Sequence, residues 1–392
     1  MDTFFRTYDY LIDNLQPALT RRLMSEIDWN SRMIGIRGTR GVGKTLFLLQ
    51  LAKERFGKDR RCLYVNMNHL YFTTHTLSEL AGRFYEQGGR VLLIDQIFKY
   101  PNWSEALQFC YSSFPELQII FAGSSAMPWS EGNVDLSDVV DSYYLRGFSF
   151  REFLNVTHGT SFKSYGLNEI IANHREISRK VTSTLNPLSQ FGDYLHHGFY
   201  PFFLERRCFS ENLMKTVNSM IESDIFFLKQ IELSYYHKIR KLLYILANQS
   251  PCSPNVSDLS KAIDTSRATV MNYIKYLQDA RLINLLYHEG DEYPKKPAKI
   301  YLHNTNLMYP LLMNKVDEQA VRETFFYNAL FKDNKLHAPT TKSTQFIVNG
   351  EYPFSVVTSR RGRRMNGIYY AVDGIQYGEG RDIPLWLFGF LY

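Results

Sequence analysis

The sequence predicts an α/β fold built on a mostly parallel sheet, followed by smaller domains. Residues 38–45, Gly-Thr-Arg-Gly-Val-Gly-Lys-Thr, fit the pattern G-x-x-x-x-G-K-[ST] of a phosphate-binding loop. Around this loop, strand-like apolar runs alternate with helical patterns, which is typical of parallel strands joined by right-handed helical crossovers. The length of 392 residues and the hydrophobic content of 45% are sufficient for two or three folded domains.

The composition narrows the class of protein. A net charge of +6 permits a nucleic-acid partner, although solubility alone explains a charge of this size. The four cysteines are scattered and form no C-x-x-C pair, which argues against a zinc site or a disulfide framework. The sequence shows neither a signal-peptide pattern nor an apolar run of membrane length, so we expect a cytoplasmic protein without membrane contact.

The glycine loop predicts a nucleotide site. Glycines allow successive backbone N–H groups to turn toward one phosphate. Lys44 would add a positive charge at the β- and γ-phosphates, and the Thr45 hydroxyl would hold Mg²⁺. Residues 32–37 have the pattern of a buried strand and residues 46–56 that of an apolar helix, which is the setting such a loop requires. The expected nucleotide-binding residues are Gly38, Thr39, Arg40, Gly41, Val42, Gly43, Lys44 and Thr45.

Further strands and helices complete the predicted nucleotide domain. Apolar residues at helical spacing predict a helix over residues 4–15, and a second helix is expected at 77–86. The strand at 90–95 ends in Asp95, which would be the second acid beside Mg²⁺, because ligands bind at the carboxyl ends of parallel strands. The other predicted strands are residues 62–67 and 117–122.

The residue after this acid bears on catalysis. Gln96 follows Asp95, and an amide cannot accept a proton at pH 7, so it cannot be the general base for hydrolysis. Glutamine can still orient a water molecule, as in Ras-type GTPases. Glu105 is a substitute base only if it leaves the solvated face of its helix. At the tip of the last strand, Ser124 or Ser125 would contact the γ-phosphate or else form an ordinary turn.

Several long segments resemble a family of bacterial and archaeal AAA-type P-loop ATPases close to the STAND group. Residues 95–103, Asp-Gln-Ile-Phe-Lys-Tyr-Pro-Asn-Trp, are similar to the family segment D-E-I-H-K-Y-P-N-W. Members of this family carry a winged helix and a C-terminal domain resembling restriction endonucleases. Other segments that resemble the family are residues 121–125, 148–154, 198–201 and 383–390.

The resemblance carries expectations of its own. It implies ATP as the nucleotide, a helical lid over residues 156–205, and a Gly-Phe-Tyr-Pro element that brings Pro201 toward the nucleotide. The sequence also departs from the family. Asp138 and Val139 stand where the family commonly has two arginines, and Gln96 stands where it has a glutamate. These departures predict that nucleotide binding is retained while hydrolysis is weak.

A compact pattern in the middle of the chain predicts a winged helix. Helices at residues 256–263 and 267–277 are followed by a strand at 282–287. A basic segment after this strand contains Lys295, Lys296 and Lys299. In the resembling ATPases such a domain often packs against the nucleotide domain without binding DNA, so both roles stay open. The residues of the second helix expected to be exposed, and therefore candidates for DNA contacts, are Arg267, Thr269, Asn272, Tyr273 and Lys275.

The last part of the chain predicts a degenerate nuclease-like domain. Strands at residues 344–348 and 352–357 flank Asn-Gly, which is a hairpin pattern. In nuclease-like relatives this hairpin carries two acids and a lysine, but here Gln345, Ser355 and Ser359 stand at those positions, so we predict no nuclease activity. The apolar residues 383–392 should be buried. A basic run, interpreted as a solvated loop or a nucleic-acid backbone contact, comprises Arg360, Arg361, Arg363 and Arg364.

The predicted architecture is therefore α/β, with a P-loop NTPase parallel sheet, a helical lid, a winged-helix domain and a small α+β nuclease-like domain. The expected function is an ATP-binding, nucleotide-dependent switch with weak or absent hydrolysis. The alternative is a DNA-binding winged-helix protein that retains nucleotide for structure. ATP and Mg²⁺ are the expected cofactors, and a protein partner or a homo-oligomer is a further expectation. The predicted domains are residues 1–155, 156–205, 206–310 and 311–392.

Overall fold

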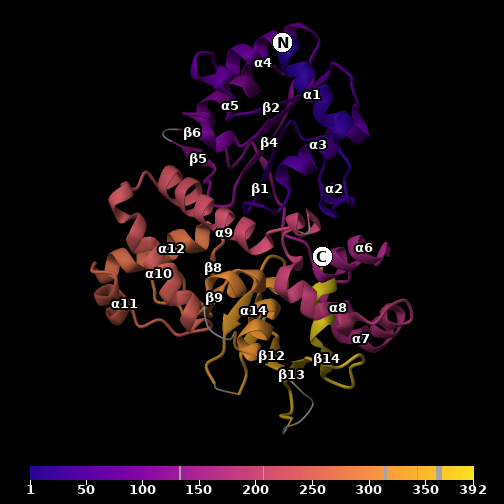
Figure 1. Cartoon of the computed structure of the whole chain (residues 1–392), viewed down its shortest axis with the longest axis vertical. Helices are drawn as coiled ribbons and strands as arrows, with labels where there is room; N and C mark the ends of the chain where they lie inside the picture. The colour runs from indigo at the N-terminus through magenta and orange to yellow at the C-terminus, as the bar shows by residue number, and fades with distance from the viewer. Residues whose placement is uncertain (132–133, 206, 313–315, 342, 359–363) are drawn as a thin grey trace. The chain divides into compact units, whose positions relative to one another are not determined.

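The chain divides into two compact units, Met1–Gly147 and Phe148–Tyr392, in the computed structural model (Figure 1). The structure describes residues 1–131, 134–205, 207–312, 316–341, 343–358 and 364–392. Unit 1 ends before the expected boundary at residue 155. In the described part of the chain, no helix is long and apolar enough to cross a membrane.

Unit 1 is organised around a five-stranded sheet with the strand order β2-β3-β4-β1-β7. All four strand pairings are parallel, as the sequence predicts. The apolar runs are buried along their whole length in β3, because helices cover both faces of such a sheet. The strands are β1 (Met33–Gly38), β2 (Cys62–Asn66), β3 (Val91–Asp95), β4 (Gln118–Ser124) and β7 (Asp141–Tyr144). The first four confirm the predicted strands, while β7 was not predicted.

The helices of unit 1 connect these strands. Thr76 and Glu79 form a capping box at the start of α4, and its apolar face is buried. The predicted helices at residues 4–15, 46–56 and 77–86 are confirmed. The helices are α1 (Asp2–Asn14), α2 (Leu23–Glu26), α3 (Lys44–Arg55), η1 (Leu70–Thr73), α4 (Leu77–Glu86), η2 (Ile97–Lys99) and α5 (Trp103–Ser113). Two short strands, β5 (Ser130–Glu131) and β6 (Val134–Asp135), pair with each other.

Unit 2 begins with a helical region. Residues 167–182 form helix α7, and the flanking residues are also more helical than their polar sequence indicates. The region contains two π-helical segments, η3 and η5. Its helices are α6 (Phe150–His158), α7 (Leu167–Thr182), α8 (Pro187–Asp193), η3 (Tyr194–Gly198), η4 (Pro201–Glu205), α9 (Phe209–Ser219), η5 (Met220–Phe227), η6 (Leu233–Tyr235), α10 (Tyr236–Gln249), α11 (Val256–Ala262) and α12 (Arg267–Asp279).

A seven-stranded sheet forms the rest of unit 2, in the order β14-β13-β12-β11-β10-β8-β9. Its strands are β8 (Ile283–His288), β9 (Lys299–Leu302), β10 (Leu336–Ala338), β11 (Phe346–Val348), β12 (Tyr352–Val357), β13 (Tyr369–Val372) and β14 (Asp382–Pro384). The antiparallel pair β8–β9 follows α12, and β8 also pairs in parallel with β10. The expected division at residue 310 therefore falls within one continuous sheet. The remaining helices are η7 (Thr305–Leu307), α13 (Met308–Leu311), α14 (Glu318–Leu330) and η8 (Leu385–Phe390).

The end of unit 2 confirms two local predictions. Strands β11 and β12 form an antiparallel hairpin around Asn349 (φ 56°) and Gly350 (φ 73°), which a tight primed turn requires. The apolar segment η8 is buried against its own unit, and the Arg151 guanidinium donates to the carbonyl of Tyr392. Arg151 thus has a structural role at the end of the chain.

Candidate functional site

The glycine loop joins β1 to α3 at the carboxyl edge of the unit 1 sheet. Gly41 (φ 84°) and Gly43 (φ 94°) adopt left-handed backbone angles, which side chains disfavour. A Cβ atom at Gly38 would lie 2.4 Å from the carbonyl oxygen of Leu145, so only glycine fits there. Helix α3 starts at Lys44, two residues before the predicted helix, and its first N–H groups are therefore available at the loop.

Lys44 folds back onto its own loop. Its ammonium donates to the carbonyl oxygens of Gly38 (2.7 Å) and Thr39 (2.9 Å). The loop is also held from outside, because the buried Arg21 guanidinium donates to the carbonyls of Val42 (3.2 Å) and Arg146 (2.7 Å). The loop is thus shaped by hydrogen bonds from the Lys44 ammonium within it and from Arg21 outside it.

Asp95 lies at the end of β3 and contacts the loop helix. The Thr45 hydroxyl donates to Asp95 Oδ2 at 2.6 Å, so the two predicted metal ligands are brought together. The Tyr64 hydroxyl (2.9 Å) and the Asn66 amide (3.3 Å) donate to the same oxygen. A hydroxyl beside a carboxylate at the start of the loop helix is an oxygen-donor set that suits Mg²⁺. These residues fit the expected metal.

Tyr64 and Asn66 were not predicted from the sequence. Asn66 is the register partner of Asp95 on the neighbouring strand, and Tyr64 lies two residues earlier on the same face of β2. The sequence offered one indication of their role, which is that both residues lie near the carboxyl end of a predicted strand. Only the order of the strands reveals that β2 lies beside β3.

Gln96 is partly exposed and adopts a left-handed backbone (φ 54°). Its side-chain oxygen accepts a hydrogen bond from Asn68 Nδ2 at 2.8 Å. Glu105 is on the exposed face of α5, as expected. Ser124 is the register partner of Gly38, and its hydroxyl accepts from the N–H of Ala126, as in a local turn.

Ser125 differs from its neighbour. Its hydroxyl oxygen is buried and has no hydrogen-bond partner among the described residues. Pro201 begins η4 in unit 2, so its approach to the nucleotide remains a prediction.

The candidate DNA contacts on α12 are largely used within the chain. Tyr273 is buried, with 4% of its surface exposed, so the expectation that it faces solvent was wrong. Asn272 accepts from the Tyr293 hydroxyl, and Lys275 pairs with Asp279 at 2.7 Å. Arg267 is exposed, and the described residues offer it no ion-pair partner.

The basic segment after β8 is also partly neutralised. Lys295 pairs with Asp291 at 2.6 Å, and Lys299 pairs with the buried Glu323 at 3.4 Å. A strongly positive face on this region is therefore not supported by these lysines.

Of the positions compared with nuclease-like relatives, the structure describes Gln345 and Ser355, and neither carries an acid. Gln345 donates to the carboxylate of Glu323 at 3.2 Å, and the Ser355 hydroxyl donates to the carbonyl of Ser343 at 3.4 Å. Within the described ranges, no group of three His, Cys, Asp or Glu residues is arranged to hold a metal. Arg364 forms a two-bond pair with Asp382. Ser359, Arg360, Arg361 and Arg363 lie outside the described residues.

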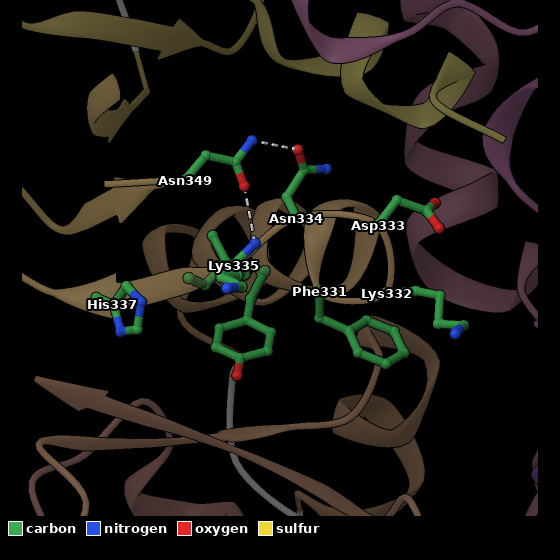
Figure 2. A pocket seen from close by; sticks show the side chains of 9 residues that line it. Phe331, Lys332, Asp333, Asn334, Lys335, His337 and Asn349 are labelled. Carbon is green, nitrogen blue, oxygen red and sulfur yellow. Dashed lines mark hydrogen bonds between the residues drawn. The ribbon is translucent and has the colours of Figure 1, made fainter. Parts of the chain in front are cut away.

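A cavity of about 740 Å³ opens beside the end of α14 in unit 2 (Figure 2). Asn349 braces one wall, because its amide donates to Asn334 and its oxygen accepts from the N–H of Lys335, both at 2.9 Å. No residue of the glycine loop lines this cavity. The lining residues are Tyr327, Phe331, Lys332, Asp333, Asn334, Lys335, Leu336, His337 and Asn349.

Family models match two parts of the chain. Residues 30–154 match a model described as an AAA domain, and residues 188–318 match a domain of unknown function, DUF8612. The first match and the parallel sheet with its glycine loop identify unit 1 as a P-loop domain of the AAA type.

Two uncharacterized proteins of Methanocaldococcus jannaschii are similar to most of the chain. One is 27% identical over 286 residues, covering 68% of this chain and 60% of the relative. The other is 25% identical over 305 residues, covering 71% of this chain and 62% of the relative. The chain therefore spans about three fifths of the length of these two relatives.

Three solved structures are similar at low identity. AMPPCP-bound DnaA from Aquifex aeolicus is 16% identical with a TM-score of 0.24, over 70% of this chain and 86% of that one. PCH-2 of C. elegans is 15% identical with a TM-score of 0.25, over 71% and 66%. The Hsp104–ADP complex of S. cerevisiae is 14% identical with a TM-score of 0.27, over 82% and 51%.

Proposed function

We propose that the chain binds ATP with Mg²⁺ in unit 1 and acts as a nucleotide-dependent switch with weak or absent hydrolysis. The observation that carries this proposal is the 2.6 Å contact between Thr45 and Asp95 beside a glycine loop that contains Lys44. A loop lysine, a helix-start hydroxyl and a strand-end acid are the parts that P-loop proteins use to hold a triphosphate and its metal. The AAA-domain match over residues 30–154 supports the same interpretation.

The roles within the site follow from its contacts. A bound phosphate would replace the carbonyls of Gly38 and Thr39 as acceptors for the Lys44 ammonium. Thr45 and Asp95 would hold Mg²⁺, which supplies positive charge to the β- and γ-phosphates. Because the Thr45 hydroxyl directs its proton to Asp95, its oxygen lone pairs are left for a cation.

Gln96 is the reason to expect weak hydrolysis. The amide cannot take a proton from an attacking water, and Asn68 already donates to its oxygen. General-base catalysis contributes about 10²- to 10⁴-fold in enzymes that have it. A protein without this contribution would keep its bound ATP unhydrolysed for longer, which suits a switch better than a motor.

The first experiment measures nucleotide content and affinity of the purified protein. We expect bound ATP or ADP, tight Mg·ATP binding, and loss of both in Lys44→Ala. Lys58→Ala is the matched control, since Lys58 is an exposed lysine of the same unit that pairs with Asp13. Absence of nucleotide binding in the unmodified protein would contradict the proposal.

The second experiment measures turnover. Gln96→Glu should raise ATP hydrolysis above the weak level of the parent protein, because it introduces a proton acceptor. Hydrolysis at ordinary enzyme rates in the parent, abolished by Lys44→Ala, would show that the weak-turnover part of the proposal is wrong. An unchanged rate in Gln96→Glu would place the defect elsewhere, such as at Asp138 and Val139.

The alternative function is DNA binding through the winged-helix segment, and the exposed Arg267 is the residue that supports it. We expect no salt-dependent mobility shift with duplex DNA, because Asn272 and Lys275 have partners within the chain. A shift that weakens with salt and disappears in Arg267→Ala would favour the alternative. We also expect no Mg²⁺-dependent DNA cleavage, since glutamine and serine stand at the nuclease-like positions.

A further inference from the structure

We propose that Tyr64 and Asn66 are positioning residues that fix the Asp95 carboxylate for Mg²⁺. This inference rests on the proposed function, because it concerns the same metal site. Neither residue belongs to the glycine loop, and neither would touch the nucleotide. Their role would be to set how tightly the metal is held.

The topology places both side chains on one carboxylate. Strand β2 runs parallel to β3, with Asn66 opposite Asp95. Residues two apart on a strand point to the same face, so the Tyr64 side chain lies on the same face of the sheet as the Asn66 side chain. The resulting bonds to Asp95 Oδ2 are 2.9 Å from the Tyr64 hydroxyl and 3.3 Å from the Asn66 amide.

The two carboxylate oxygens of Asp95 have different tasks. Oδ2 accepts hydrogen bonds from Thr45, Tyr64 and Asn66, and these bonds fill its acceptor capacity. Oδ1 receives the N–H of Gln96 at 2.9 Å, and the described residues supply it with no other donor. One acceptor position therefore stays open on Oδ1, which is the oxygen we assign to the metal or a water bound to it.

Burial makes this arrangement stiff. Asp95 is 1% exposed and Tyr64 is 6% exposed, so water cannot replace the phenol if it is removed. Without Tyr64 and Asn66, the carboxylate would be held, among the described residues, only by Thr45 and by the N–H of Gln96, and it would present Oδ1 to the metal less often.

A purely structural role for Tyr64 makes a different prediction. If the phenol only satisfied a buried acceptor, its removal would weaken nucleotide binding equally with and without Mg²⁺. If it positions Asp95, the loss appears only when Mg²⁺ is present. Partners of metal ligands in other proteins change metal affinity by about 10- to 100-fold when they are mutated.

The experiment measures ATP affinity of the full chain by calorimetry, once with Mg²⁺ and once with EDTA. We expect Tyr64→Phe to weaken the Mg²⁺-dependent affinity by about 10-fold and to leave the EDTA affinity unchanged. Asn66→Ala should act in the same direction with a smaller effect, because its bond is longer. Tyr8→Phe is the matched control, since that buried phenol donates to the Gly57 carbonyl in the same unit.

A double-mutant cycle with Asp95→Asn completes the test. Tyr64→Phe should have little further effect in the Asp95→Asn background, because the carboxylate it positions is gone. Equal losses with Mg²⁺ and with EDTA, or no loss in either variant of β2, would overturn the inference. If the unmodified protein binds ATP equally well with and without Mg²⁺, the inference also fails while nucleotide binding stands; if it binds no ATP, the proposed function fails as well.

Discussion

At the scale of single residues, Gly38 is the position where the loop tolerates no side chain. A Cβ atom there would lie 2.4 Å from the Leu145 carbonyl, and backbone atoms cannot move aside as a flexible side chain can. We therefore predict that Gly38→Ala displaces the start of the loop and lowers ATP affinity at least tenfold. Overpacking of this kind costs about 1–3 kcal/mol of stability.

Calorimetric ATP binding and thermal unfolding would check this prediction. Gly166→Ala is the control, because no heavy atom lies within 4 Å of the added methyl group and its backbone is extended. Full ATP affinity in Gly38→Ala would mean that the loop can shift without losing its donors.

At the scale of elements, a buried carboxylate joins α14 to two strands. Glu323 accepts from Gln345 of the hairpin segment (3.2 Å) and from Tyr301 of β9 (3.3 Å), and it pairs with Lys299. We predict that Gln345→Glu destabilises the protein by about 1–3 kcal/mol, because it removes a donor and places a second negative charge beside a buried one.

Chemical unfolding monitored in unit 2 would measure this loss. Exchanging the two groups, with Glu323→Gln added to Gln345→Glu, should recover most of the stability, because one donor and one carboxylate again face each other. If Gln345→Glu alone is neutral, then Glu323 is not held by the Gln345 amide.

The contact between α7 and the loop before β14 should depend on pH. His174 is 6% exposed, and its Nε2 lies 3.2 Å from the Gly380 carbonyl oxygen. The neutral ring can donate a hydrogen bond to this oxygen. Burial lowers the pKa of His174 below its ordinary value of 6.5. The unfolded chain therefore binds the proton first, so the folded state loses stability as the pH falls below 6.5 and this loss is complete below the lowered pKa.

Unfolding free energies between pH 5 and pH 8 would test this dependence. The stability difference between the parent protein and His174→Gln should shrink or reverse as the pH falls, because glutamine takes up no proton. His158→Gln is the control, since His158 is exposed at the end of α6. A difference that is constant with pH would show that His174 does not titrate on unfolding.

The sequence predicted local features better than pairings between distant elements. Strands of unit 1 were predicted because continuous apolar runs surround a specific loop motif. The exposure of Tyr273 was predicted wrongly, although its spacing from Val270 and Leu277 matches the buried face of a helix. The partners of Asp95 on β2 depend on strand order and register, which no local pattern contains.

At the scale of the whole molecule, the seven-stranded sheet decides which parts of unit 2 unfold together. The β8–β9 pair follows helices α11 and α12, yet β8 pairs with β10 through Tyr287 and His337. Backbone pairing across the expected boundary at residue 310 couples these segments. This pairing joins residues that lie far apart in the sequence. The local pattern of helices and strands does not contain it and therefore predicted two separate domains.

We therefore predict that β8 and β12 share one opening free energy in native-state hydrogen exchange of the full chain, as elements of one cooperative unit do. If β8 instead exchanges at a much lower free energy than β12, then the strand pairing with β10 is too weak to join the two segments, and residues 256–302 unfold as a domain of their own.

Nucleotide binding should change the same measurement in unit 1. Saturation with Mg·ATP at about 100 times its Kd should add about 2.7 kcal/mol to the protection of β3, whose unit contains the loop. The Lys44→Ala variant, measured in the same way, should lack that increase and serves as the control.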